Sequence, residues 1–224
     1  MGSSSYGITA RPVILLVQVF GVTACVLVLY WCLHYGGGLA FSSSNKDHIF
    51  NLHPVMMFIG YIFLASQAIL SFKMVPVKKK LQKIVHLSLL GLSTIIGAFG
   101  IYPVFKVHHE TNIDNMFSLH SWIGMGAVCL FGVQWMVGFI TFLYPGASMR
   151  IRTSVVPWHV FFGLFLYAMA IVAAETGFLD KLEIQEIETG LDKFGSEAML
   201  VNFTAVIILL FAMLVVLSTV LPGA

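Results

Sequence analysis

Charged residues are scarce in this chain of 224 residues. Only 10% of them are Asp, Glu, Lys or Arg, against about a quarter in soluble proteins, and the mean hydropathy is +0.92. A soluble domain of this length could not bury so much apolar surface. Lipid is therefore the expected solvent for most of the chain, and no nucleic-acid partner is expected.

Cysteine is also scarce, and its positions exclude one kind of site. Cys25, Cys32 and Cys129 all lie inside or at the end of apolar runs, and no two of them form a C-x-x-C motif. Covalent attachment of haem through C-x-x-C-H is therefore excluded. We expect all three to be packing residues, as buried free cysteines usually are.

Six apolar runs are long enough to cross a membrane as helices, since a spanning helix needs about 20 mostly apolar residues. The N-terminus lacks the basic segment and cleavage site of a signal peptide, so the first run is expected to remain. The sequence predicts an all-α integral membrane protein with one domain over residues 1–224 and a core at 52–176. The expected spans are 13–34, 52–72, 84–105, 118–142, 156–176 and 198–220.

Lys and Arg divide unevenly between the two ends of these spans. Eight lie at the end that carries both termini and four at the other, which predicts cytosolic termini. The eight are Arg11, Lys73, Lys78, Lys79, Lys80, Lys83, Arg150 and Arg152, and the four are Lys46, Lys106, Lys181 and Lys193. All carboxylates lie at the second end, most of them in residues 175–197, which we interpret as a solvated amphipathic turn.

Four of the eight histidines lie in the expected spans at paired depths. His53 and His120 are near the outer ends of the second and fourth spans, and His86 and His159 near the cytosolic ends of the third and fifth. Ionisable residues in membrane helices are costly and are usually functional. A b-type haem needs two axial imidazoles. The depths predict two haems in a central bundle of spans two to five, one at each pair.

Glycines share helical faces with these histidines, at offsets of four, seven or eleven positions. The pairs are His53 with Gly60, His86 with Gly97, His120 with Gly124 and His159 with Gly163. We expect these glycines to leave room for a flat macrocycle, and close helix packing is the alternative. Zinc is not expected, because it prefers tetrahedral N/S sites and no Cys or carboxylate lies at either histidine level.

Several short motifs surround these histidines. They are K-x-x-H from Lys83 to His86, SLHSW at 118–122, VQWMVGF at 133–139, YPGAS at 144–148 and VPWHVFFG at 156–163. In order and spacing they resemble the cytochrome b561 family of ascorbate-reducible transmembrane cytochromes, from about His53 to Ala174. The resemblance implies an oxidoreductase that passes one electron from cytosolic ascorbate through two non-covalent, bis-histidine b haems. The acceptor on the other side would be monodehydroascorbate or a ferric chelate.

Several basic residues lie near the expected inner haem and are candidates to bind the ascorbate anion. Lys79 and Lys83 share a helical face with His86, and Arg152 lies just ahead of the fifth span. We expect all three cations to bind the ascorbate anion, with Lys83 as the catalytic contact, although such cations also act as topology signals. Lys73 stands where the family has an arginine and is expected to contact a haem propionate.

On the outer side, residues 106–117 are expected to form the loop between the third and fourth spans. Its His108, or His109 beside it, is the candidate to contact the oxidised substrate or take its proton, since imidazole titrates near neutral pH. A solvated loop histidine is the alternative, and His34 and His48 are expected to be ordinary loop residues. The residues expected to hold the outer propionates are Asn115, Met116, Phe117 and Ser118.

Two other classes of function stay open. One is a six-helix transporter or proton channel with a histidine relay, which a haem spectrum would exclude. The other is a haem-bearing membrane anchor of a dehydrogenase, which would need a partner subunit. The host membrane is expected to be vacuolar, vesicular, endosomal or plasma membrane, and a homodimer is one possible assembly.

The charge asymmetry makes a prediction about sidedness. A membrane-impermeant amine label should reach the lysines of residues 73–83 in sealed vesicles only from the cytosolic face, because that loop carries the excess of cations. Mass spectrometry of the labelled peptides measures this. Labelling from the opposite face would invert the orientation.

Overall fold

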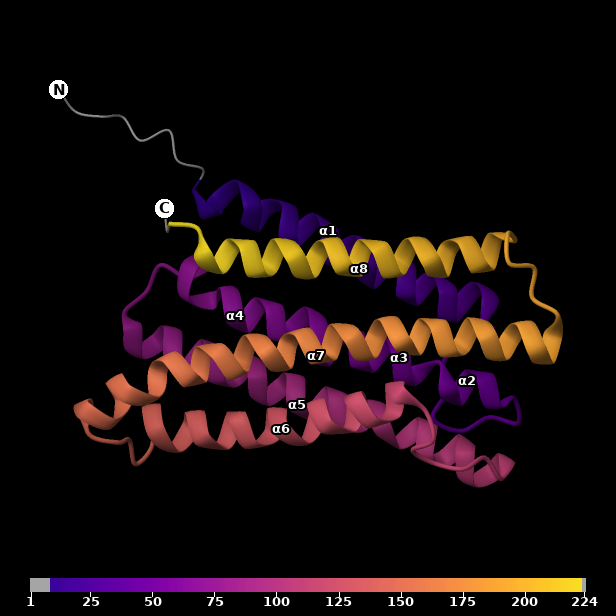
Figure 1. Cartoon of the computed structure of the whole chain (residues 1–224), viewed down its shortest axis with the longest axis horizontal. Helices are drawn as coiled ribbons and strands as arrows, with labels where there is room; N and C mark the ends of the chain where they lie inside the picture. Colours follow the sequence, from indigo (N-terminus) through magenta and orange to yellow (C-terminus); the bar gives the residue numbers. More distant parts are fainter. Residues whose placement is uncertain (1–8, 223–224) are drawn as a thin grey trace.

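The computed structural model describes residues 9–222, and over these residues it contains six helical spans and no β-strand (Figure 1). The first span is α1 (Ala10–Tyr30) with the π-helical η1 (Trp31–Tyr35). The second is built from α2 (Lys46–Phe50), α3 (Leu52–Met57), the π-helical η2 (Phe58–Leu64) and α4 (Ala65–Met74). The others are α5 (Lys79–Thr111), α6 (Leu119–Phe142), α7 (Met149–Thr189) and α8 (Ser196–Val220). The expected all-α membrane fold is confirmed.

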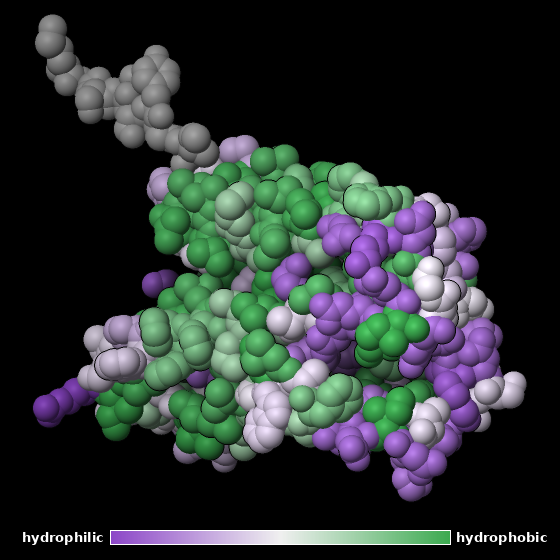
Figure 2. Space-filling view, turned by 45° about the vertical axis from the view of Figure 1, so that its right-hand side comes forward, coloured by the Kyte–Doolittle hydropathy of each residue, from purple (hydrophilic) through white to green (hydrophobic). Residues whose placement is uncertain are grey.

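The helices turn large apolar side chains outward. Phe99, Val133 and Phe161 are each more than half exposed, as expected for a surface in contact with lipid acyl chains. Figure 2 shows this apolar surface, with polar residues gathered toward the end of the bundle that carries α2. Helices suit such a solvent because every backbone N–H and C=O is satisfied within the segment.

The spans pack mainly as three pairs: α1 with α8, the second span with α5, and α6 with α7 (Figure 1). The first and last spans meet at their ends, where the Ala10 N–H donates to the Pro222 carbonyl at 3.1 Å. The expectation that the N-terminus is not a signal peptide partly concerns residues 1–8, which lie outside the described residues. The pairing places α3, α5, α6 and α7 around the four span histidines.

Two helices run further than expected. Helix α7 continues to Thr189, so the interpretation of residues 175–197 as a turn is wrong for its first part. Helix α5 continues to Thr111, which places His108 and His109 in its last turn and not in a loop. Each helix ends at a residue with left-handed backbone, Gly190 at φ 69° and Asn112 at φ 54°, which is a common way to end a helix.

The histidines outside the four ligand candidates also lie in helices. His34 is in η1 and stacks on Tyr30, with ring centroids 4.9 Å apart, and His48 is in α2. The turn between these helices is held by the buried Asn51, whose amide nitrogen donates to the carbonyls of Cys32, Gly36 and Gly38. The expectation that His34 and His48 are loop residues is therefore wrong.

Candidate functional site: two histidine pairs and their surroundings

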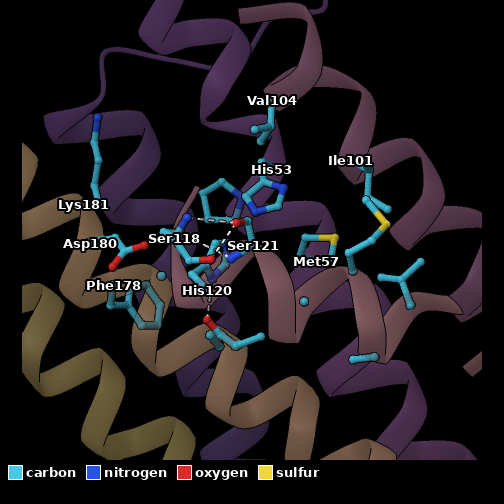
Figure 3. A pocket seen from close by; sticks show the side chains of 18 of the residues that line it. His53, Met57, Ile101, Val104, Ser118, His120, Ser121, Phe178, Asp180 and Lys181 are labelled. Atoms are coloured by element: carbon cyan, nitrogen blue, oxygen red, sulfur yellow. Dashed lines mark hydrogen bonds between the residues drawn. The ribbon is translucent and has the colours of Figure 1, made fainter. Parts of the chain in front are cut away.

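The outer histidine pair comes from two different spans. His53 on α3 and His120 on α6 have ring centroids 5.9 Å apart, and Figure 3 shows the two side chains converging. Two imidazoles that bind one metal from opposite sides, through bonds of about 2 Å, place their centroids about 6 Å apart. The spacing therefore fits one iron between the rings.

Hydrogen bonds fix the orientation of both outer rings. The Nδ1 atom of His53 lies 2.8 Å from the Gly100 carbonyl, and that of His120 lies 2.7 Å from the Ala173 carbonyl. Since a carbonyl only accepts, each Nδ1 carries the proton. Each Nε2 then presents a lone pair, which is the usual arrangement of a metal-binding histidine.

The inner pair has similar spacing. His86 on α5 and His159 on α7 have ring centroids 6.3 Å apart. The Nδ1 atom of His86 lies 2.8 Å from the Ala68 carbonyl, whereas that of His159 lies 3.1 Å from the side-chain nitrogen of Gln134. The structure thus pairs the same histidines that their depths in the spans predict.

A mainly apolar cavity surrounds the outer pair. Its volume is about 220 Å³, whereas one water needs about 10–15 Å³ by the same measure, so it accommodates a ligand far larger than water. Its apolar lining with a few polar groups is typical of a cofactor site. The predicted residues Asn115, Met116, Phe117 and Ser118 all line it.

His108 also lines this cavity, at the end of α5. Its Nδ1 lies 3.0 Å from the Asn115 side-chain oxygen, and its ring stacks on Phe117. Ser118 is the N-cap of α6 and forms a reciprocal capping box with Ser121, which fixes the first turn of α6, where His120 lies. The residues predicted at the outer side, His108 and residues 115–118, therefore all line the same cavity.

Lys181 is a cavity residue that sequence reasoning missed. It lies beside Asp180 in Figure 3, forms an ion pair with Asp47 at 3.6 Å, and places its ammonium 5.0 Å from the centre of the Phe50 ring. No motif surrounds Lys181 in the sequence, where it is one of the four basic residues expected at the outer ends of the spans.

Two further glycines were missed, and both face a ligand candidate. A Cβ atom on Gly177 of α7 would lie 2.7 Å from the His120 ring, and one on Gly138 of α6 would lie 3.0 Å from the His159 ring. Each glycine stands at the same offset from the histidine of its own helix (138 − 120 = 177 − 159 = 18). This equal spacing is the signal that could have identified them.

The four glycines that were expected to leave room for a macrocycle have different surroundings from one another. Gly124 lines the outer cavity, as expected. Gly60 instead packs against the backbone of α5 at Ser93 and Gly97, and Gly97 packs against the Tyr61 ring. At these two positions the alternative of close helix packing is correct.

Gly163, the fourth of these glycines, has the side chain of Gln134 as its near neighbour. A Cβ atom added to Gly163 would lie 3.6 Å from the Gln134 amide nitrogen. The space beside Gly163 is therefore shared with a polar side chain on α6.

The expected basic residues lie at the opposite end of the bundle. Lys79 is the first residue of α5, and Lys83 follows one turn later, one turn before His86. Within residues 9–222 neither ammonium has a hydrogen-bond or ion-pair partner. Arg152 donates from Nε to the Ala147 carbonyl at 2.7 Å.

The contacts of Lys73 do not support its expected role as a haem-propionate contact. Its ammonium donates to the carbonyls of Ser218, Thr219 and Leu221 at 2.6–2.9 Å. These bonds use all three of its donors, and a cation at a helix C-terminus is stabilising. Lys73 therefore caps α8, which leaves no N–H for a propionate.

The contacts of Gly177 predict a contrast between two glycine substitutions. Gly177→Ala should destabilise the protein by about 1–3 kcal/mol, because the new methyl group overlaps a ring that is hydrogen-bonded in place. Gly132→Ala has open space around it and should be neutral or stabilising by up to about 1 kcal/mol. Thermal unfolding in detergent measures both, and equal midpoints would contradict the packing described.

Comparison with known proteins extends these observations. Residues 52–185 match the family described as eukaryotic cytochrome b561. The chain is 49% identical over 218 residues to a probable ascorbate-specific transmembrane electron transporter 1 of Oryza sativa subsp. japonica, covering 97% of this chain and 93% of that protein.

Two further relatives carry ferrireductase names. Transmembrane ascorbate ferrireductase 1 of Arabidopsis thaliana is 47% identical over 211 residues, which cover 94% of this chain and 88% of the relative. A lysosomal membrane ascorbate-dependent ferrireductase of Danio rerio is 34% identical over 210 residues, covering 90% and 84%. The chain belongs to the eukaryotic cytochrome b561 family.

Proposed function

We propose that this protein is a transmembrane oxidoreductase that carries one electron from cytosolic ascorbate through two b haems to an acceptor on the opposite side. The observation that carries the proposal is the presence of two histidine pairs with ring centroids 5.9 and 6.3 Å apart, each joining two spans. The relatives named for ascorbate-dependent electron transport support the donor. The acceptor is monodehydroascorbate or a ferric chelate.

A b-type haem is the cofactor of this cytochrome family, and when bound it supplies reversible one-electron chemistry at its iron. His53 and His120 hold the outer haem, and His86 and His159 the inner one. The fit is supported by the ring spacing and by the apolar cavity at the outer pair.

The N-terminus of α5 is the proposed ascorbate site. No acidic residue lies in its first turn, and no side chain caps it, although the helix dipole favours negative charge there. Three consecutive lysines at this position, 78–80, do not stabilise the helix, whereas they would stabilise a bound anion. Lys79 and Lys83 bind ascorbate beside His86, and Arg152 is the third cation.

At the other end, the cavity mouth is the proposed exit for the electron. The bond to Asn115 and the stacking on Phe117 hold His108 beside the cavity. When monodehydroascorbate is the acceptor it takes up one electron and one proton, and His108 delivers the proton. When a ferric chelate is the acceptor it takes up the electron alone.

The proposed orientation places both termini and the ascorbate site in the cytosol. Six apolar helices make the chain a multi-pass membrane protein. The proposed domain is a single six-span unit over residues 1–224 with its core at 52–176. The host membrane is vacuolar, vesicular, endosomal or plasma membrane, and a homodimer is the proposed assembly.

The paired histidines predict two haems per chain. A pyridine-haemochrome assay against protein concentration should give a ratio of two. His86→Ala should lose the inner haem and His120→Ala the outer one, because each removes one axial ligand from a single pair. Each variant should therefore retain a ratio near one.

The matched control is His34→Ala, which removes an imidazole from η1 that belongs to neither pair. It should retain both haems. A wild-type ratio near one, or loss of both haems from either ligand variant with the fold intact, would contradict the assignment.

The ascorbate site predicts different effects for two nearby lysines. Lys83 lies one turn before His86, whereas Lys78 lies ahead of the first turn of α5. Lys83→Ala should slow ascorbate-dependent haem reduction roughly 10- to 150-fold, the equivalent of one charge-assisted hydrogen bond of about 1.5–3 kcal/mol. Lys78→Ala should have little effect. Stopped-flow absorbance measures both rates.

Reduction by dithionite is the control, since it does not depend on a specific anion site. It should be complete and equal in both variants. If the ascorbate kinetics of the two variants are also equal while the haem content is intact, Lys83 acts only as a topology signal.

A further inference from the structure

The histidines of the second span and α5 are held reciprocally. His53 bonds to the carbonyl of Gly100, which follows His86 on α5 at an offset of 14 (100 − 86). His86 in turn bonds to the carbonyl of Ala68, which follows His53 at an offset of 15 (68 − 53). The π-helical η2 lies in this second interval and accounts for the longer offset. Each helix thus supplies an acceptor for the histidine of the other.

Helices α6 and α7 repeat this arrangement at only one of their two histidines. His120 bonds to the carbonyl of Ala173, which follows His159 at the same offset of 14 (173 − 159). The equivalent position after His120 is Gln134 (134 − 120 = 14), and it meets His159 with its side chain instead of its backbone carbonyl. His159 is therefore the exception among the four.

The surroundings of the Gln134 amide define which of its atoms faces His159. One terminus of the amide lies 2.7 Å from the carbonyl oxygen of His159 and 3.1 Å from its Nδ1. An oxygen there would oppose another oxygen, so this terminus is the nitrogen, which donates to the carbonyl. A neutral imidazole that binds iron through Nε2 carries its proton on Nδ1. Two donors then face each other.

We propose that Gln134 is a positioning residue that deprives His159 of an acceptor at Nδ1 and thereby raises the reduction potential of the inner haem. The inference rests on the proposed bis-histidine ligation. An acceptor at Nδ1 makes a histidine a more basic ligand, which favours oxidised iron. Without one, His159 is the weakest electron donor of the four histidines, and the inner site takes an electron from ascorbate more readily.

The test is a redox titration of the holoprotein, followed by visible absorbance, with two substitutions of Gln134. Gln134→Glu replaces the facing amide nitrogen by a carboxyl oxygen, whose lone pairs accept from Nδ1, and in the protonated form its O–H still donates to the His159 carbonyl. It should shift the inner one-electron equilibrium toward oxidised haem on the order of tenfold, which is about 59 mV. Gln134→Met removes the opposing N–H and should shift it in the same direction by less. The outer potential should stay unchanged in both variants.

Gln18→Met is the matched control, because Gln18 is a half-buried glutamine on α1 whose amide contacts Gln67 and Met74 and no histidine. It should leave both potentials unchanged. Unchanged inner potentials in both Gln134 variants, an upward shift in either, or an equal shift of both haems would overturn the proposal. So would loss of the inner haem from both variants.

The bis-histidine ligation, on which this inference rests, is tested by separate measurements. If wild-type protein contains fewer than two haems, or if His159→Ala retains the inner haem, the bis-histidine assignment fails whatever Gln134 does. If two haems are present and His159→Ala loses one, the redox titration tests Gln134 alone.

Discussion

The arrangement depends on hydrogen bonds that run from a histidine Nδ1 on one helix to a carbonyl on its neighbour. In lipid there is no water to accept a hydrogen bond from Nδ1, so any acceptor comes from the protein. A helical carbonyl already accepts one bond but has a second lone pair, and it lies at the helix surface. Three of the four histidines use this device, at 2.7–2.8 Å. It orients the rings and holds the helices at a fixed separation.

Close approach of the helices explains Gly60, Gly97, Gly138 and Gly177, whereas Gly124 lines the outer cavity. An imidazole that reaches a neighbouring backbone leaves no volume for a side chain where it crosses the helix, and Gly177 lies at the crossing of His120. The sequence predicted the six spans and both histidine pairs, because hydropathy and the helical rise fix the depth of each residue. The equal offset of 18 marks Gly138 and Gly177 in the sequence, but only the packing shows which histidine each glycine faces, and only the packing shows that Gly60 and Gly97 are sites of close helix contact.

The lysines illustrate the same limit of sequence patterns. Lys73 and Lys83 contribute equally to the cation excess that predicts the cytosolic side, yet Lys73 completes the C-terminus of α8 while Lys83 has no partner within residues 9–222. Only the packing of α4 on α8 distinguishes them, and a linear sequence does not encode that proximity directly. The helical extensions of α5 and α7 were predictable in part, since Asn112 and Gly190 are both common helix-ending residues.

The two ends of the bundle differ in how their cations are used. At the outer end Lys46 pairs with Glu110, Lys181 with Asp47 and Lys193 with Glu186. At the other end, among the described residues, the lysines of 78–83 have neither a carboxylate nor a carbonyl partner. Carboxylates therefore neutralise much of the outer positive charge, while the inner charge remains available to an external anion. Since an anionic reductant gathers where cations are unpaired, this asymmetry supports the proposed direction of electron transfer, with entry at the inner histidine pair and exit at the outer one.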